Sequence, residues 1–274
     1  MGNADGQTLA RPDAEGAPRV AGPGGRVTAK AAVFLAVAFL AAGALGAAQA
    51  GTPIPTEVVQ LTQFGPALGV AVVALLWRGE IRSLLAGALR GGARFGSRGV
   101  LLLATAPLIV ALCATGYGVV TGDVRFTGPS SLGNPLVVIV VAQFIGACGE
   151  ELGWRCLLQP LLRTRCGPLA SSVTVGLLWG VWHVQVFAQD PAYTGAFLLA
   201  TVSLSVVLGS ALERVRGSRL LLAGGFHMLI NLGLLLFMDE ESGAVLPMVL
   251  FALACLTPAV IWALGAKRAA GPAR

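Results

Sequence analysis

The sequence contains few charged residues. Asp, Glu, Lys and Arg make up 12% of its 274 residues, whereas 55% are hydrophobic. Soluble globular proteins carry roughly a quarter charged residues, and a soluble domain with this composition would have too little polar surface to cover its core. The composition therefore favours an all-α, polytopic integral membrane protein.

Cysteine and histidine are also scarce, and several familiar motifs are missing. The five cysteines are odd in number and show no paired spacing, so they indicate neither a disulfide framework nor a zinc knuckle. The chain has no Gly-x-Ser-x-Gly elbow and no His-Glu-x-x-His motif. No nucleic-acid module is found, and the net charge of +6 is better explained by membrane orientation and anionic lipid headgroups.

Long hydrophobic runs dominate what is present. About twenty mostly apolar residues suffice to cross a bilayer core of about 30 Å, and eight runs approach this length. They lie near Ala29 to Ala50, Leu61 to Trp77, Val100 to Val120, Pro135 to Arg155, Leu169 to Ala188, Tyr193 to Leu212, Leu220 to Met238, and Val245 to Ala266.

Basic residues alternate from loop to loop, as expected when Lys and Arg remain in the cytoplasm. With eight spans, one side receives Arg11, Arg19, Arg26, Lys30, Arg78, Arg82, Arg90, Arg94, Arg98, Arg163, Arg165, Arg214, Arg216, Arg219, Lys267, Arg268 and Arg274. The other side receives Glu57, Asp123, Asp190, Asp239, Glu240 and Glu241, with Arg125 as its base. We therefore expect a multi-pass plasma-membrane protein with both termini in the cytoplasm, a disordered tail at 1–27 and a transmembrane domain at 28–268.

The fourth run carries charge inside the membrane. The fourteen residues from Pro135 to Cys148 cover roughly 21 Å as a helix, so the helix must continue through Glu150, Glu151 and Arg155, near the cytoplasmic third of the membrane. Glu151 and Arg155 are four residues apart and can pair on one face, whereas Glu150 points about 100° away and stays free. The alternative is that both acids reach the interface at the end of the helix.

Both histidines lie in apolar runs. The four-residue spacing in Trp179-Gly-Val-Trp-His183 and in His227-Met-Leu-Ile-Asn231 places each pair on one helix face. A histidine in a membrane helix can simply bond a neighbouring helix, but ionisable groups inside a membrane are expensive and usually functional. Other polar residues such as Gln143 are assigned no chemistry.

Glu-Glu-x-x-x-Arg, aromatic-x-x-x-His and His-x-x-x-Asn occur in this order between Pro135 and Met238. The pattern resembles the CPBP or Abi family of CAAX-type prenyl endopeptidases and bacteriocin-processing or self-immunity proteins, with Trp179 where the family usually has phenylalanine. The resemblance implies a protease core at about 135–238 that hydrolyses a peptide bond of a membrane-associated peptide or lipidated protein.

The resemblance also implies residue roles. Glu150 and His183 would activate a water molecule, His227 and Asn231 would stabilise the oxyanion, and Glu151 and Arg155 would position the helix. Such a mechanism matches the expected chemistry of a carboxylate base in a low-dielectric cavity and of donors at a developing oxyanion.

Another mechanism and two other functions are also compatible with these residues. We favour a mechanism without a cofactor, but Glu150, His183 and His227 could bind zinc. Two non-enzymatic functions are also compatible with the residues: a transporter using the polar groups as a relay, or a membrane immunity protein that sequesters a peptide without cleaving it.

Overall fold

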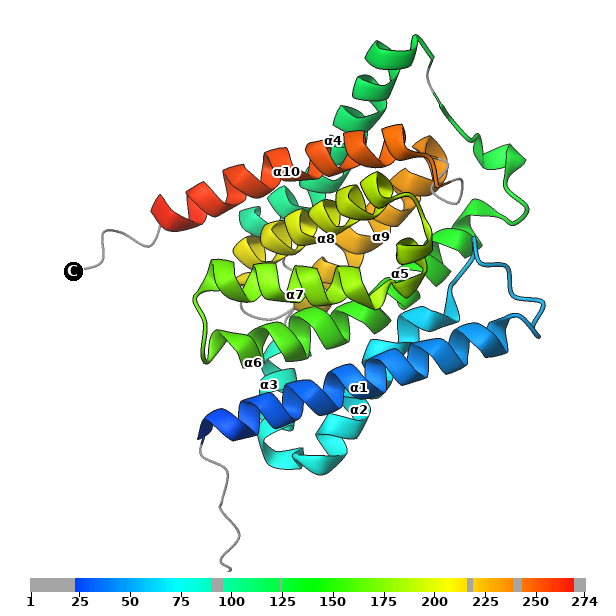
Figure 1. Cartoon of the computed structure of the whole chain (residues 1–274). Coiled ribbons are helices and arrows are strands. Elements are labelled where there is room, and N and C mark those ends of the chain that lie inside the picture. The colour runs from blue at the N-terminus through cyan, green and yellow to red at the C-terminus, as the bar shows by residue number, and fades with distance from the viewer. Residues whose placement is uncertain (1–22, 90–95, 124, 216–218, 239–242, 269–274) are drawn as a thin grey trace, which may run out of the picture.

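The computed structural model describes residues 23–89, 96–123, 125–215, 219–238 and 243–268, and over these ranges the chain is helical without strands (Figure 1). The elements in chain order are α1 (Pro23–Gln49), η1 (Leu61–Phe64), α2 (Gly65–Leu76), α3 (Arg78–Leu89), α4 (Ser97–Thr121), η2 (Pro129–Ser131), α5 (Leu136–Gly153), η3 (Trp154–Leu158), α6 (Gln159–Arg163), α7 (Pro168–Trp182), η4 (Val184–Ala188), α8 (Pro191–Leu212), α9 (Arg219–Phe237) and α10 (Val245–Arg268).

Six helical stretches of the described chain are long and apolar enough to cross a membrane. The other two expected spans are shorter apolar helices, Leu61–Leu76 and Pro168–Trp182. The prediction of a polytopic, all-α membrane bundle is therefore confirmed. Helix α1 begins at Pro23, so the tail boundary expected at residue 27 falls inside this helix, while residues 1–22 lie outside the described part.

Helix α5 runs further than the sequence suggested. It continues through η3, which is a π-helical turn, and through α6 to Arg163. Pro160 explains the wide turn, because proline has no N–H to donate and its ring clashes with the carbonyl four residues earlier. In the π turn, the Gln159 N–H donates instead to the Trp154 carbonyl oxygen. Glu150 thus lies near the middle of the continuous helical stretch Leu136–Arg163.

Helix α7 is shorter than expected, because the span predicted to reach Ala188 ends at Trp182. His183 explains the stop. Its backbone N–H donates to the Gly180 carbonyl, and its imidazole Nδ1 lies 2.9 Å from the Trp179 carbonyl oxygen, which an α-helix would pair with the backbone N–H of residue 183. The side chain therefore caps the helix on which it lies.

Close helix contacts bring the motifs together. Almost every residue of α8 from Ala200 onwards is buried, and this helix packs against α7 and α10. A Cβ atom at Gly176 of α7 would lie 2.6 Å from the Val202 Cα atom of α8, so only glycine permits this approach. Gly224 likewise allows α9 to approach α5 closely, because a Cβ atom there would collide with Cys148. Small residues at such contacts are typical of membrane bundles.

The two ends of the bundle differ in charge. The beginnings of α1, α4, α7 and α9 and the ends of α6, α8 and α10 lie at one end, on the left in Figure 1. We call this the basic end because it holds Arg26, Lys30, Arg98, Arg163, Arg165, Arg214, Arg219 and Lys267. The opposite end holds the connections at 50–60, 122–135 and 183–190, including Arg125. Asp239, Glu240 and Glu241 lie outside the described residues.

Candidate active site

The predicted site residues come from three elements that pack around one cavity. Glu150 lies on α5, His183 follows the end of α7, and His227 and Asn231 lie one turn apart on α9. All four line a cavity of about 1140 Å³. The structure therefore brings these residues together from segments up to 81 positions apart in sequence, as the distance from Glu150 to Asn231 shows.

Glu151 belongs to a buried ionic cluster behind the cavity. Its Oε2 atom lies 3.3 Å from Arg155 Nε, and both side chains are fully buried. The pair expected from the four-residue spacing is therefore present. Its other oxygen, Oε1, lies 2.9 Å from His227 Nδ1. A carboxylate oxygen accepts this bond, so the proton is on Nδ1, and Glu151 orients the His227 ring as well as pairing with Arg155.

Glu150 points in a different direction from Glu151, as predicted, but it has a partner. Trp179 Nε1 donates a 2.8 Å hydrogen bond to Glu150 Oε2, and the Glu150 residue is only 2% exposed. The Arg155 guanidinium carbon lies 4.8 Å from the centroid of the Trp179 ring. Trp179 therefore lies between Glu150 and the Glu151–Arg155 ion pair, and its indole N–H fixes one oxygen of Glu150.

Both histidines use the same ring nitrogen, Nδ1, in a contact within the protein. The Nδ1 atom of His183 is occupied by the Trp179 carbonyl oxygen, which can only accept, so Nδ1 carries the proton. The ring packs edge-on against Phe197 and Trp182, with centroids 5.1 and 4.9 Å away. These aromatic contacts fix the His183 ring, and no hydrogen bond to Nε2 of either histidine is found in the described part of the chain.

Asn231 is held by a residue to which sequence reasoning assigned no chemistry. Its Nδ2 donates a 3.0 Å hydrogen bond to Gln143 Oε1, and Gln143 Nε2 donates in turn to the Glu57 carbonyl oxygen at 3.2 Å. Gln143 precedes Glu150 by seven residues, which is two helical turns on the same face. This spacing is the signal that could have identified it as an orienting residue.

The cavity opens at the end of the bundle opposite the basic end. Most of its exposed lining residues belong to the connections there: Thr56, Gln60, Arg125, Phe126, Thr127, Ser131, Val184, Gln185 and Gln189, while Gly43 and Ala47 of α1 are also exposed. The apolar part of the lining includes Phe39 and Ala42 of α1 and Leu235 of α9. A lining that combines polar and apolar side chains suits an extended, amphipathic ligand.

The geometry gives no support to the zinc alternative. Within the described residues, no three His, Cys, Asp or Glu side chains lie together in an arrangement that could hold a metal ion. Glu150, His183 and His227 line the same cavity but each already uses one polar atom in a protein contact. We therefore derive no step through a metal.

Comparison with known proteins supports the family resemblance. Residues 132–233 match the family model described as Type II CAAX prenyl endopeptidase Rce1-like. Lysostaphin resistance protein A from Staphylococcus epidermidis is 28% identical over 124 residues, which cover 45% of this chain and 32% of that protein. The protein of the same name from Staphylococcus aureus is 27% identical over 114 residues, covering 42% and 27% respectively. This chain thus matches about a third or less of the length of these curated relatives. The resemblance predicted from the three motifs is confirmed.

Proposed function

We propose, from the Rce1-like domain at residues 132–233, that this protein is an intramembrane endopeptidase that hydrolyses a peptide bond of a membrane-associated or lipidated peptide. One observation carries the proposal: a buried carboxylate, two imidazoles and an amide line the same cavity. These four groups can provide a base and oxyanion donors. No serine or cysteine nucleophile is required.

Glu150 is the proposed base. Its Oε2 atom is held by Trp179 Nε1, which leaves Oε1 to accept a proton from water. His183 can hold the same water through Nε2, because its Nδ1 proton is directed at a backbone carbonyl. The bond from Trp179 fixes the Glu150 carboxylate, which would hold Oε1 in line with the attacking water.

His227 and Asn231 are the proposed oxyanion donors. The Asn231 amide has two N–H groups, of which one is used by Gln143. His227 can donate through Nε2 when its ring carries both protons, with Glu151 as counter-ion at Nδ1. Two carboxylates, Glu150 and Glu151, are then balanced by Arg155 and the imidazolium. In that protonation state these four buried groups carry no net charge.

The proposed reaction is balanced with water as the only co-reactant. The water oxygen bonds to the substrate carbonyl carbon while Glu150 takes its proton, and the negative charge moves to the carbonyl oxygen, where His227 and Asn231 donate. When the tetrahedral species collapses, the C–N bond breaks and Glu150 passes the proton to the leaving nitrogen. The products are a carboxylic acid and an amine, and Glu150 is regenerated.

We also propose that the substrate enters from the non-cytoplasmic side of the plasma membrane. Most of the exposed lining residues belong to the end of the bundle that is poor in Lys and Arg, whereas these residues concentrate at the basic end. Basic loops remain in the cytoplasm, so the basic end and both termini are assigned to that side. The scissile bond would then lie in the external or outer-leaflet part of the substrate.

A non-catalytic function is the second candidate, because the matched relatives are named for resistance to lysostaphin. A cavity lined by both polar and apolar side chains could sequester a peptide without cleaving it. Peptide binding and hydrolysis depend differently on Glu150, so one substitution separates them.

The proposed test uses purified protein in detergent with a library of membrane-embedded and lipidated peptides. Mass spectrometry should detect a product that takes one ¹⁸O atom from labelled water with the wild type, and no such product with Glu150→Gln, although the variant still binds the peptide. Binding without product in the wild type would favour sequestration. Activity lost to a chelator and restored by zinc would replace the metal-free mechanism.

The side of access needs a separate test with a membrane-impermeant peptide. Cleavage should occur when the peptide is added to right-side-out vesicles and should be lost with inside-out vesicles from the same cells. Cleavage by the inside-out preparation alone would overturn the proposed orientation of the cavity while leaving the chemistry intact.

A further inference from the structure

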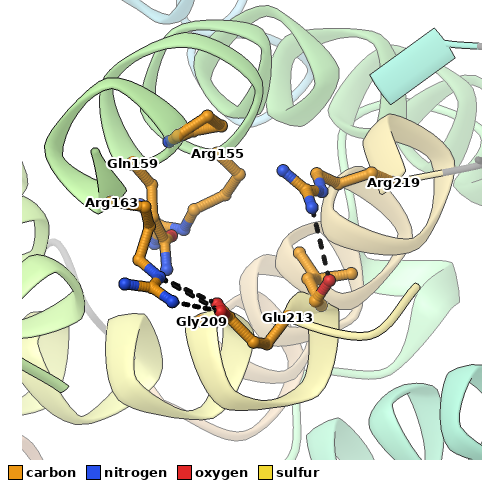
Figure 2. A pocket seen from close by; sticks show the side chains of 8 residues that line it. Arg155, Gln159, Arg163, Gly209, Glu213 and Arg219 are labelled. Atoms are coloured by element: carbon orange, nitrogen blue, oxygen red, sulfur yellow. Dashed lines mark hydrogen bonds and ion pairs between the residues drawn. The ribbon is translucent and has the colours of Figure 1, made fainter. Parts of the chain in front are cut away.

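A second cavity lies at the basic end of the bundle. Its volume is about 190 Å³, and the lining residues are Arg155, Gln159, Pro160, Arg163, Gly209, Leu212, Glu213 and Arg219. Figure 2 shows this pocket between the helix that carries Arg155 and Gln159, the end of α8 and the start of α9. Arg155 lines this pocket but not the large cavity, and it is connected to the candidate active site through its ion pair with Glu151.

Two of its arginines have N–H groups without a hydrogen-bond partner among the described residues. Arg155 is 1% exposed, and its Nη1 and Nη2 atoms have no hydrogen-bond partner in the described part of the chain. Arg219 Nε is also buried without such a partner, and Nη2 of that residue makes one long bond of 3.4 Å to the Leu212 carbonyl oxygen. Buried donors without acceptors are costly, especially when charged. A ligand with acceptor oxygens would remove this cost.

The third arginine is already occupied. Arg163 Nε donates to both oxygens of Glu213 at 3.1 Å, and its Nη1 donates to the Cys166 carbonyl oxygen at 2.7 Å. Figure 2 shows the Arg163 and Glu213 side chains joined along one edge of the pocket. Glu213 is thereby neutralised and does not compensate the other two guanidinium groups.

The remaining charges leave the pocket positive. Arg155 is balanced by Glu151, whose Oε2 lies 3.3 Å from Arg155 Nε, and Glu213 is balanced by Arg163. Of the three guanidinium groups, only that of Arg219 has no carboxylate partner among the described residues. The pocket therefore presents one net positive charge together with the unused N–H groups of Arg155 and Arg219.

We propose that this pocket binds a phosphate group, carried by an anionic lipid headgroup or free in solution. Guanidinium groups match phosphate oxygens with pairs of charge-assisted hydrogen bonds. The pocket lies at the end of the bundle assigned to the cytoplasm, at the level where α8 ends and α9 begins, and basic pockets between membrane helices at this side are suited to lipid phosphates. Gly209 allows α8 to approach Gln159 and Ser172 closely, because a Cβ atom there would collide with both side chains.

The test compares thermal unfolding of the purified protein in detergent with four additions: inorganic phosphate, chloride at equal ionic strength, phosphatidylglycerol, and diacylglycerol, which lacks the phosphate. The variant is Arg219→Gln, and the matched control is Arg165→Gln, an exposed arginine at the same end that does not line the pocket. We expect phosphate or phosphatidylglycerol to raise the Tm of the wild type and the control, with an apparent Kd at least tenfold weaker in Arg219→Gln.

The four additions also identify the source of the phosphate. A response to phosphatidylglycerol alone assigns the site to lipid, whereas a response to inorganic phosphate as well assigns it to the free group. The proposal is overturned if neither phosphate compound acts more strongly than its phosphate-free counterpart, or if the two variants respond alike.

A second variant keeps the proposal testable if Arg219→Gln does not fold. Arg219→Lys keeps the charge but loses the planar pair of donors. Native mass spectrometry should then find less bound phosphatidylglycerol or phosphate than on the wild type under equal conditions. Equal occupancy of the wild type and Arg219→Lys would contradict the proposal without requiring Arg219→Gln to fold.

Discussion

Replacing Arg155 by alanine removes the counter-ion of a carboxylate that cannot reach water. Arg155 and Glu151 both have fully buried side chains, with 3.3 Å between Nε and Oε2. Removing one partner of a buried ion pair costs roughly 3–5 kcal/mol, because the other charge stays in a low-dielectric environment. The substitution also removes the guanidinium from the face of Trp179, which loses packing as well as charge.

Two structural features bring the expected loss of folding free energy towards the lower limit of this range. Glu151 keeps its bond to His227, and the 190 Å³ pocket beside Arg155 allows water to enter the vacated volume. We therefore expect Arg155→Ala to lower the free energy of unfolding by about 3 kcal/mol. Less folded protein should be recovered, and activity should fall with it.

A double-mutant cycle gives the control. Glu151→Gln combined with Arg155→Ala leaves neither charge of the pair without its counter-ion, so the combined loss should be smaller than the sum of the two single losses by about 2 kcal/mol. The assay is reversible unfolding in mixed micelles. Additive losses would refute the energetic reasoning. Normal stability of Arg155→Ala with activity lost would instead make Arg155 a substrate-binding residue.

Three further predictions concern the mechanism and the topology. Trp179→Phe should keep at least a tenth of the wild-type turnover, since the family usually has phenylalanine at this position; a loss beyond about 100-fold, or about 2.7 kcal/mol, would place the indole N–H in the mechanism. Asn231→Ala should lower kcat by roughly 10² to 10³-fold with little change in KM, and a change confined to KM would remove it from the oxyanion site. A membrane-impermeant thiol reagent should label a Ser130→Cys variant in intact cells and label the exposed Cys166 only after permeabilisation; labelling of both in intact cells would contradict the topology.

Hydropathy and spacing predicted most of the helices because both depend on local sequence. Six of the eight expected spans are long enough to cross the membrane, and the Glu151–Arg155 pair follows from one helical turn. The four predicted site residues also reach one cavity. Their chemical roles remain predictions.

Other features depend on contacts that no local pattern contains. The end of α7 at Trp182 results from the His183 ring bonding its own helix. The π turn after Glu151 follows from Pro160, but the sequence placed the helix end before that proline. Proline shows that a helix is disturbed, yet it does not show whether the helix stops or continues.

The hydrogen-bond partners of the site residues could not be predicted from the sequence either. The hydrogen bond from Trp179 to Glu150 joins α7 to α5, and the bond from Asn231 to Gln143 joins α9 to α5. Such bonds depend on which helices are neighbours and how they are rotated, and both follow from packing across the bundle. The helix spacing placed Gln143 and Glu150 on one face, but only the arrangement of helices shows what that face contacts.

If Glu150 activates water for peptide hydrolysis, the ratio of wild-type to Glu150→Gln turnover measures its contribution most directly. The measurement uses one identified peptide, purified proteins of equal thermal stability, and a chelator throughout. The isosteric amide cannot take a proton, so we predict a loss of roughly 10² to 10⁴-fold. Turnover of Glu150→Gln within a few-fold of the wild type would contradict the account.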